Sequence, residues 1–196
     1  MDLRRAPKGW CAQLRQLAAG PAAQQLVSRA MQIIGPKLDA RAQCEEVLRS
    51  LPMWFGIEEA LVMYADDTLR LPTFAALDGE RILGFVSLME HFPCAWEIHC
   101  IAVRAASRNA GYGRALVAHI ETWLTAKNVS LLQVKTVAAT SPSKAYAQTR
   151  EFYSHLGFQP LEVFPLLWAP QNPCLQLVKL LPAANPSLQR TAPDRR

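Results

Sequence analysis

The chain has 196 residues, of which 51% are hydrophobic, and a mean hydropathy of +0.03. This length suits one domain, and the composition excludes both a disordered chain and a membrane protein. The net charge of +5 is confined to the ends, because residues 1–15 and 190–196 hold seven basic and two acidic residues while the remainder holds 14 of each sign. We therefore expect no nucleic-acid partner.

Export and membrane insertion are not indicated by any segment. No apolar run approaches the roughly 20 residues of a membrane helix, and the charged start leads into no apolar signal segment, so we expect a cytoplasmic protein. The five cysteines are scattered and lack a Cys-x-x-Cys pair, which favours reduced thiols over a disulfide framework. We expect no metal site, since the spacing of His91, Cys94, His99 and Cys100 matches no common zinc site.

The order of helical and extended patterns predicts an α+β domain. We expect residues 1–27 to be an extension, residues 28–181 the domain, and residues 182–196 a loose tail. The first half of the domain is predicted to contain two helices, a hairpin and a further strand. These elements are expected at 39–51, from 56 onward, at 71–77 and 81–91 around the turn Asp78-Gly79, and at 96–103.

The second half of the predicted domain contains one crossover. An apolar helical stripe from Gly111 to about Lys127 precedes a strand at 131–137, and a second helix runs from about Ser143 to Gly157. Two strands, at 160–168 and 174–181, follow. The predicted order is α-α-β-β-β-α-β-α-β-β, a sheet with one β-α-β unit in its middle.

A phosphate-binding turn is predicted where the strand 96–103 passes into the next helix. Free amides at a helix N-terminus and the positive end of the helix dipole can hold a phosphate. Gly111 and Gly113 lack side chains that would keep phosphate oxygens from the backbone, and Arg108 and Arg114 add charged donors. Walker and dinucleotide loops are excluded, because neither set of required residues follows the second glycine. A helix-start turn without a ligand is the alternative.

Two motifs in this order resemble the GNAT superfamily of acyl-CoA-dependent N-acyltransferases. Arg108-Asn109-Ala110-Gly111-Tyr112-Gly113 is similar to the family's Arg/Gln-x-x-Gly-x-Gly/Ala, and Phe152-Tyr153-Ser154-His155-Leu156-Gly157-Phe158 is similar to its Phe-Tyr-x-x-x-Gly-Phe. The resemblance covers about residues 70–181. It implies a mixed, mostly antiparallel central sheet with flanking helices, splayed between the strands 96–103 and 131–137, and acetyl-CoA as the acyl donor.

The resemblance also implies a cofactor site. Backbone groups of Ile101 and Val103 would pair with the pantetheine arm like an added strand. Tyr146 stands where many family members carry an asparagine that contacts the cofactor. The pyrophosphate would be held by the backbone amides of Asn109, Ala110, Gly111, Tyr112, Gly113 and Arg114.

Three side chains are candidates for catalysis. Strand alternation predicts that Glu97, His99, Ile101 and Val103 share one face. We expect Glu97, its pKa raised by desolvation, or a water that it orders, to take the proton of an amine, with His99 as the second candidate. A salt bridge and a core histidine are the alternatives. Tyr153 matches the tyrosine with which the family commonly protonates the departing thiolate, and helix packing is its alternative role.

The acceptor site is expected beside the first two predicted helices, where the family builds its acceptor wall. A glutamate pair beside aromatic rings could hold a cationic amine, although such charges can also form a solvated helix face. The residues concerned are Trp54, Phe55, Glu58, Glu59 and Tyr64.

The expected function is that of an N-acetyltransferase in which a primary amine attacks acetyl-CoA directly. The alternative is a non-catalytic acyl-CoA-binding module, since the same turn serves both. A nucleic-acid binder that acts through its basic ends is a third reading, and it predicts salt-sensitive binding. The acceptor and the oligomeric state, a homodimer included, stay open.

Overall fold

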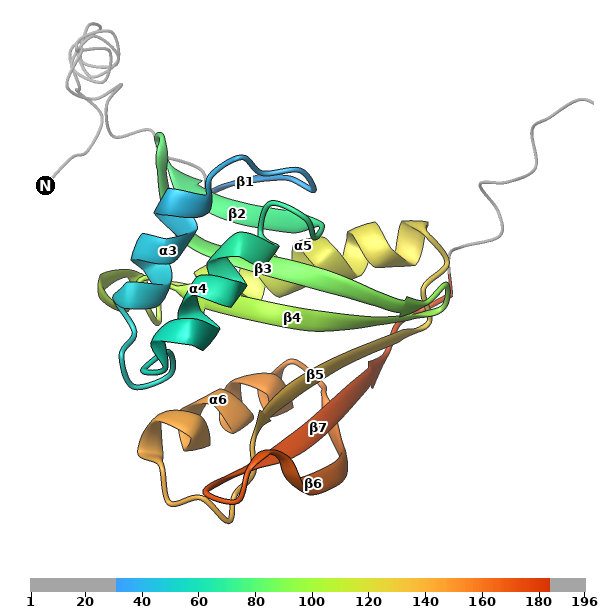
Figure 1. The fold of residues 1–196 in the computed structure, drawn as a ribbon. Helices are drawn as coiled ribbons and strands as arrows, with labels where there is room; N and C mark the ends of the chain where they lie inside the picture. The colour runs from blue at the N-terminus through green and yellow to red at the C-terminus, as the bar shows by residue number, and fades with distance from the viewer. Residues whose placement is uncertain (1–30, 184–196) are drawn as a thin grey trace, which may run out of the picture. The chain divides into compact units, whose positions relative to one another are not determined.

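The computed structural model describes residues 31–183, in which a seven-stranded sheet is flanked by helices on both faces (Figure 1). The sheet order is β1-β2-β3-β4-β5-β7-β6. The strands are β1 (Gln32–Ile34), β2 (Thr73–Asp78), β3 (Arg81–Phe92), β4 (Ala95–Val103), β5 (Leu131–Val137), β6 (Gln159–Ala169) and β7 (Asn172–Leu180). The helices are α3 (Arg41–Arg49), α4 (Glu58–Asp67), α5 (Tyr112–Ala126) and α6 (Lys144–His155), with the short 3-10 helix η1 (Ala105–Ser107) before α5.

Local sequence signals account for most of these elements. Gly79 has a φ of 62°, as the tight β2–β3 hairpin requires, and Gly157 has a φ of 86° after α6. The Ser143 side chain caps α6 by accepting a hydrogen bond from the amide of Tyr146. Every expected helix and strand is present. β1 was not expected, because its three residues are too few to form a periodic pattern.

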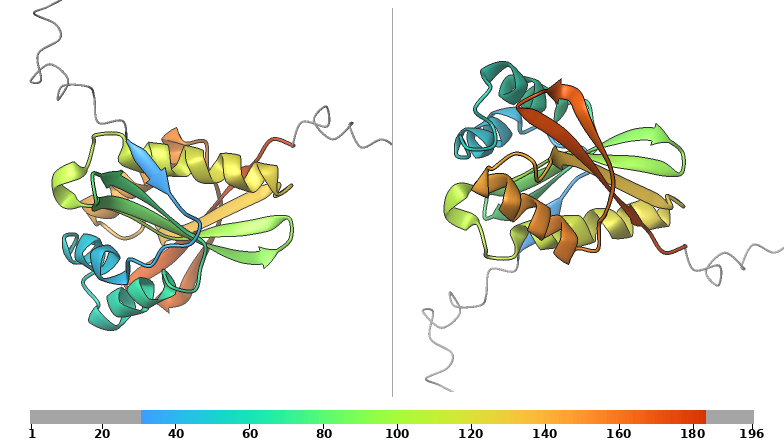
Figure 2. Two further views of the ribbon diagram at one scale, coloured as in Figure 1. Left: turned by 90° about the horizontal axis from the view of Figure 1, so that it is seen from above. Right: turned by 90° about the horizontal axis from the view of Figure 1, so that it is seen from below.

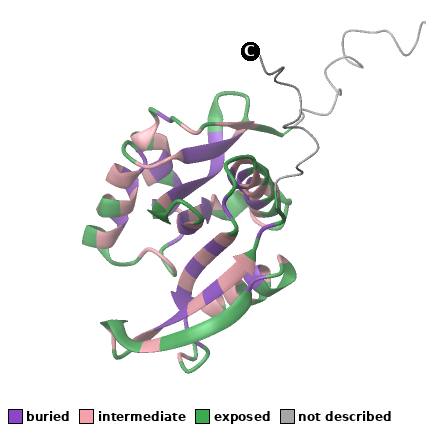
Figure 3. Cartoon of the chain, turned by 90° about the vertical axis from the view of Figure 1, so that its right-hand side faces the viewer, coloured by how far each residue is buried: buried purple, intermediate pink, exposed green. Residues whose placement is uncertain are grey.

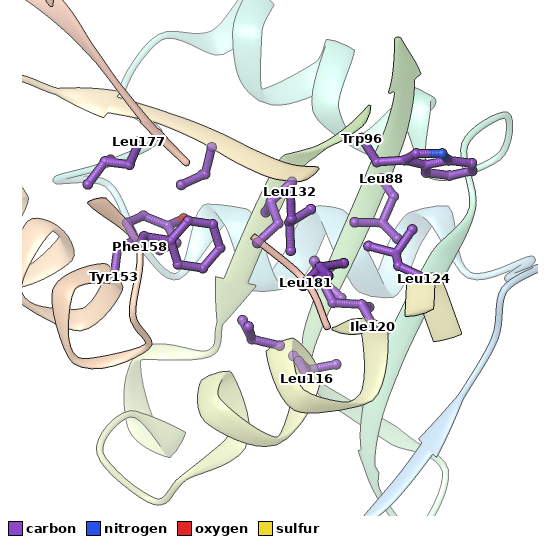
Figure 4. Packing of buried hydrophobic residues seen from close by; sticks show 14 of the residues in the cluster. Leu88, Trp96, Leu116, Ile120, Leu124, Leu132, Tyr153, Phe158, Leu177 and Leu181 are labelled. Carbon is purple, nitrogen blue, oxygen red and sulfur yellow. The ribbon is translucent and has the colours of Figure 1, made fainter. Parts of the chain in front are cut away.

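Two apolar layers cover the two faces of the sheet. Cys44, Val47 and Leu61 of α3 and α4 pack on one face together with Phe85. On the other face, α5 and α6 pack over a cluster that includes Leu132, part of which is drawn in Figure 4. The views along the sheet in Figure 2 show the helices on these opposite sides. We call the two sides the α3/α4 face and the α5/α6 face.

The parallel strands β4 and β5 pair only over their first residues. Their register runs from Ala95 opposite Leu131 to Ile98 opposite Val134, although both strands continue further. Figure 1 shows the two ribbons parting beyond this point. All other neighbouring strands are antiparallel. The expected fold, an α+β domain with a mixed sheet splayed between these strands, is confirmed.

A β-bulge in β4 overturns one expectation. Ser87 of β3 pairs with Cys100, and Leu88 pairs with Ile98, so His99 is an extra residue in β4. An extra residue reverses the faces of all that follow it. Ile98 therefore packs in the α5/α6 layer, whereas Cys100 packs in the α3/α4 layer.

The expectation that Glu97, His99, Ile101 and Val103 share one face is consequently wrong. Glu97 and His99 lie on the α3/α4 face. Ile101 packs on the α5/α6 face, as does Val103, whose Cγ2 lies 3.7 Å from the position that a Cβ on Gly113 of α5 would occupy. A regular alternation could not foresee the bulge, because no residue type in 96–103 marks it.

The edge strand β6 is exposed along nearly its whole length (Figure 3). Apolar side chains at the surface of this strand are Leu161, Val163, Leu166, Leu167 and Trp168. The expected extension 1–27 lies outside the described residues, as do residues 184–196 of the expected tail. The domain boundaries stay a prediction.

Candidate active site

The turn between β4 and α5 presents a row of free backbone amides. Asn109 has a φ of 61° and the helix N-cap Gly111 a φ of 89°, so left-handed residues alternate with others along the turn. Such alternation directs successive N–H groups toward one concavity. Among the described residues, no acceptor binds the amides of residues 109–114. Six amides that lack an internal partner can hold an anion.

The two glycines of this turn are required for different reasons. A Cβ on Gly111 would meet no atom within 4 Å, so this residue serves through its positive φ and leaves the turn open. A Cβ on Gly113 would lie 3.2 Å from Cζ of Phe152, which belongs to α6. Gly113 therefore lets α5 and α6 approach each other, and the phosphate clearance expected from the sequence stays a prediction.

The free edge of β4 leads directly to this turn. The amide of Arg104 donates to the carbonyl of Leu83 at 2.7 Å, so this position points toward β3. Because backbone groups alternate in direction along an antiparallel strand, those of Val103 and Ile101 point away from β3 and toward the side where β5 has parted. These two expected cofactor residues thus carry unpaired backbone groups beside the amides.

Trp54, from the segment between α3 and α4, joins three parts of the site. Its indole Nε1–H donates to Thr149 Oγ1 at 3.0 Å, and its carbonyl accepts from the Tyr146 hydroxyl at 3.2 Å. The Arg108 guanidinium lies 4.2 Å from the indole centroid and also donates to Gln148 Oε1 at 3.4 Å. The residue expected at the acceptor therefore contacts two residues expected at the cofactor.

The two arginines of the turn differ in their surroundings. Arg108 is engaged by Trp54 and Gln148. Arg114 is exposed in the first turn of α5, and no described residue pairs with its guanidinium. Arg114 is accordingly the freer of the two cations for a phosphate.

Glu97 is a buried carboxylate with three donors on one oxygen. Its Oε2 accepts from Lys135 Nζ at 2.5 Å and from Gln133 Nε2 at 2.9 Å, and it lies 2.7 Å from His91 Nε2. No described residue donates to Oε1. The ion pair with Lys135 joins β4 to β5 close to the point where they part.

His99, the residue of the bulge, is paired with a carboxylate. Its Nε2 lies 2.8 Å from Asp67 Oδ2, and Arg70 donates to the other oxygen of Asp67 at 2.5 Å. The ring of Tyr64 packs edge-on against the imidazole at a centroid distance of 5.3 Å. His99 Nδ1 has no partner among the described residues.

Tyr153 lies in the α5/α6 layer, on the other side of the sheet. Its ring packs against Phe152 and Phe158, and the residue is buried. Burial raises the pKa of Tyr153, and the negative charges of Cys100 and Tyr64 add to this shift. No described residue hydrogen-bonds to the Tyr153 hydroxyl.

The expected acceptor residues fall into two groups. Phe55 packs edge-on against Tyr64, with 5.9 Å between the ring centroids, and so lies one ring away from His99. Glu58 is paired with Arg49 at 2.6 Å, and both Glu58 and Glu59 are exposed on the first turn of α4. The structure brings the aromatic residues together and leaves the two glutamates at the surface.

The family of the domain follows from a sequence match. Residues 70–160 match the acetyltransferase (GNAT) domain family. This segment holds the free amides, the splayed strands and α6. It is a GNAT acetyltransferase domain. Proteins of this family take the acetyl group from acetyl-CoA.

Solved structures share the GNAT fold at low sequence identity. A protein assigned to the GNAT acetyltransferase family from Desulfovibrio desulfuricans is 18% identical, with a TM-score of 0.68 over 78% of this chain and 100% of that chain. An aminoglycoside 6'-N-acetyltransferase complexed with coenzyme A is 18% identical, with a TM-score of 0.62 over 78% and 98%. The Escherichia coli ribosomal-protein-S18-alanine N-acetyltransferase is 16% identical, with a TM-score of 0.63 over 79% and 96%. Comparison with curated protein sequences gave no match.

The GNAT domain has the features that coenzyme A requires. The open left-handed turn at Gly111 leaves space over the amides, Arg114 supplies a cation, and the unpaired edge of β4 can accept a strand-like arm. Within residues 31–183, no group of three or more His, Cys, Asp or Glu is arranged to hold a metal ion, and no helix is long and apolar enough to cross a bilayer.

Sequence reasoning missed several polar residues of the GNAT domain. Asp67 and Lys135 contact the two candidate bases from α4 and β5, and Thr149 holds Trp54. These contacts join residues 32, 38 and 95 positions apart. Only Lys135 had a usable signal, because it is the one charged residue in β5.

Proposed function

We propose that the chain is an N-acetyltransferase that transfers the acetyl group of acetyl-CoA to a primary amine. The observation that carries this proposal is the row of six unpartnered amides at the start of α5, beside the free edge of β4. Pyrophosphate binding by these amides and strand-like pairing with Ile101 and Val103 would place the thioester where β4 and β5 part. The cofactor residues are those predicted from the sequence, 108–114 and Tyr146 included.

The proposed reaction uses groups from both faces of the sheet. Bound acetyl-CoA supplies an activated thioester carbonyl. A base on β4, Glu97 or a water that it orders, with His99 as the second candidate, takes the proton of the ammonium, and the freed nitrogen attacks. Tyr153 donates its hydroxyl proton to the departing sulfur. The Tyr153 hydroxyl is protonated at neutral pH and therefore has a proton to donate.

The acceptor is proposed to enter on the α3/α4 face, near Trp54, Phe55 and Tyr64. The aromatic rings of this wall suit a cation. Glu58 and Glu59 would act at the entrance, since both are exposed. Two similar structures are named for an aminoglycoside and for the alanine of a ribosomal protein, so small molecules and protein N-termini are both to be tested.

The test measures binding and turnover separately. Calorimetry with coenzyme A should show binding to the wild-type chain, and weaker binding after Gly111→Val/Gly113→Val. Release of the free thiol from acetyl-CoA is then followed with spermidine, an aminoglycoside and an alanine-terminated peptide. Glu97→Gln and Tyr153→Phe should lower kcat by about 100-fold or more if they carry proton transfer.

Each outcome separates the readings. Absence of coenzyme A binding would reject the proposed site. Binding without turnover of any amine would favour the non-catalytic acyl-CoA-binding module. Unchanged kcat in both Glu97→Gln and Tyr153→Phe would remove these two residues from the mechanism while leaving the transferase intact.

A further inference from the structure

The two candidate bases on β4 differ in how their polar atoms are engaged. Oε2 of Glu97 receives Lys135 and Gln133 and contacts His91, which holds the carboxylate within a network on the sheet. His99 has a single polar partner, Asp67, and its Nδ1 has no described partner. Glu97 is thus engaged by three side chains through one oxygen, whereas His99 has one polar partner and keeps its Nδ1 available.

The position of His99 also favours it. The last residue pair between β4 and β5 is Ile98 with Val134, so His99 is the first β4 residue beyond the pairing. It is the extra residue of the bulge, on the α3/α4 face where the acceptor is proposed to enter. The strand pairing and the bulge together place the imidazole at the point where the sheet opens.

Asp67 fixes the imidazole from the last turn of α4. Its Oδ2 contacts His99 Nε2 at 2.8 Å, and its Oδ1 accepts from Arg70 at 2.5 Å, so both oxygens are held. The side chains of Asp67 and His99 are each only 14% exposed, which keeps water from competing for the contact. The titratable groups around His99 are Asp67 and Tyr64 of α4, Glu97 and Cys100 of its own strand, and Arg70 beyond Asp67.

We propose that Asp67 is a positioning residue that holds His99 with the Nε2 proton directed at Asp67 and Nδ1 free to take the proton of the acceptor amine. This inference rests on the proposed function. An ionised carboxylate accepts but cannot donate, so the Nε2 contact selects the tautomer whose Nδ1 lone pair is free. The carboxylate also stabilises the imidazolium that forms.

The proton balance of this step is complete. One N–H bond of the ammonium breaks and its proton goes to His99 Nδ1, from which it later leaves to solvent. The nitrogen lone pair forms the C–N bond as the C–S bond breaks, and Tyr153 protonates the sulfur. The second proton that the nitrogen releases returns to the Tyr153 oxygen, so both catalytic groups regain their starting states.

The kinetic test uses the amine that the panel identifies and the full chain. Asp67→Asn should lower kcat by about 100-fold, because the base is misoriented. KM should change less than about twofold, because the binding of the amine is not affected. The pH profile of kcat/KM should differ from that of the wild type, since the imidazolium loses its anion. Asp67→Glu should recover part of the rate. Asp66→Asn is the matched control, because its carboxylate pairs with Arg41 at 2.5 Å rather than with His99.

A second measurement needs no acceptor. Nitrogen NMR of the histidine rings, assigned with His99→Gln, should show the Nε2–H tautomer of His99 in the wild type and lose it in Asp67→Asn. A wild-type Nδ1–H tautomer would overturn the proposal. An Asp67→Asn enzyme with the wild-type pH profile would also overturn the proposal. The same holds if Glu97→Gln is the one variant whose pH profile loses its acidic limb. Failure of every amine in the panel would count against the proposed function, and the ring spectra would still decide whether Asp67 orients His99.

Discussion

At Gly111 the backbone has a φ of 89°, and at Gly113, two residues later, a Cβ would press on Phe152. The motif that contains both glycines thus combines a left-handed turn, which we propose binds the ligand, with the close packing of α5 against α6. Substitutions at the two positions should consequently have different effects on binding and on stability.

Gly111→Ala should cost about 1–2 kcal/mol of unfolding free energy, because alanine is strained at this φ, and should weaken coenzyme A binding several-fold. Gly157→Ala is the control, since Gly157 has a φ of 86° and its Cβ would meet only Lys179 Cε at 3.7 Å. It should lose similar stability in urea unfolding and keep its affinity in calorimetry. Equal losses of coenzyme A affinity in both variants would contradict a direct role of the turn in binding.

Ionisation of Tyr64 should make the stability of the domain depend on pH in the alkaline range. Burial, and then nearby negative charges with Cys100 first among them, raises its pKa from 10.0 to about 12. The folded state therefore keeps a proton that the unfolded state loses above pH 10, so this contribution to stability is present below pH 10 and is lost as the pH rises toward 12. Urea titrations over this range should show a shallower loss for Tyr64→Phe than for the wild type. Parallel curves would contradict the assignment.

At the level of helices and strands, most of the fold could be predicted because the signals are local. Asp78-Gly79 marks the hairpin, and an apolar stripe marks α5. The bulge at His99 could not be predicted, because it depends on how β4 pairs with β3. The consequence was a wrong assignment of faces from Cys100 onward.

The part of the candidate site that lies within a sequence motif could be predicted. Residues 108–114 form a turn whose geometry follows from its own glycines. The groups around Glu97 and His99 come from α4 and β5, so their contacts depend on tertiary packing that no short pattern records. The roles assigned to all these residues stay proposals.

The ion pair of Glu97 with Lys135 fastens β4 to β5 where their pairing ends. Lys135→Met would leave a carboxylate that is only 9% exposed without its cation, and should cost about 3 kcal/mol of unfolding free energy. The double variant Glu97→Gln/Lys135→Met should cost clearly less than the sum of the single variants. Strictly additive losses in urea unfolding would show that the two side chains do not interact.

Across the whole domain, the two parts of the sheet are joined through four residue pairs of β4 and β5. A ligand that occupied the unpaired stretch would act as a missing strand, and its binding energy would add to the stability of the fold. Coenzyme A at one hundred times its dissociation constant should raise the unfolding free energy by about 2.7 kcal/mol.

Hydrogen exchange should localise that effect. Amides of residues 109–114 and of the free edge of β4 should exchange more slowly with coenzyme A bound, whereas β1 and β2 should change little. Slowing that is uniform over the sheet, or absent from the turn, would be inconsistent with the proposed mode of binding.

The contacts of Trp54 have a kinetic consequence. Its indole and carbonyl are held by α6, and the guanidinium of Arg108 lies against its ring. A phosphate that drew Arg108 toward itself would free one face of that indole, next to the place where an amine is proposed to arrive. We therefore expect an obligatory sequence of substrate addition, donor before acceptor, with the emission of this tryptophan changing at the first of the two events.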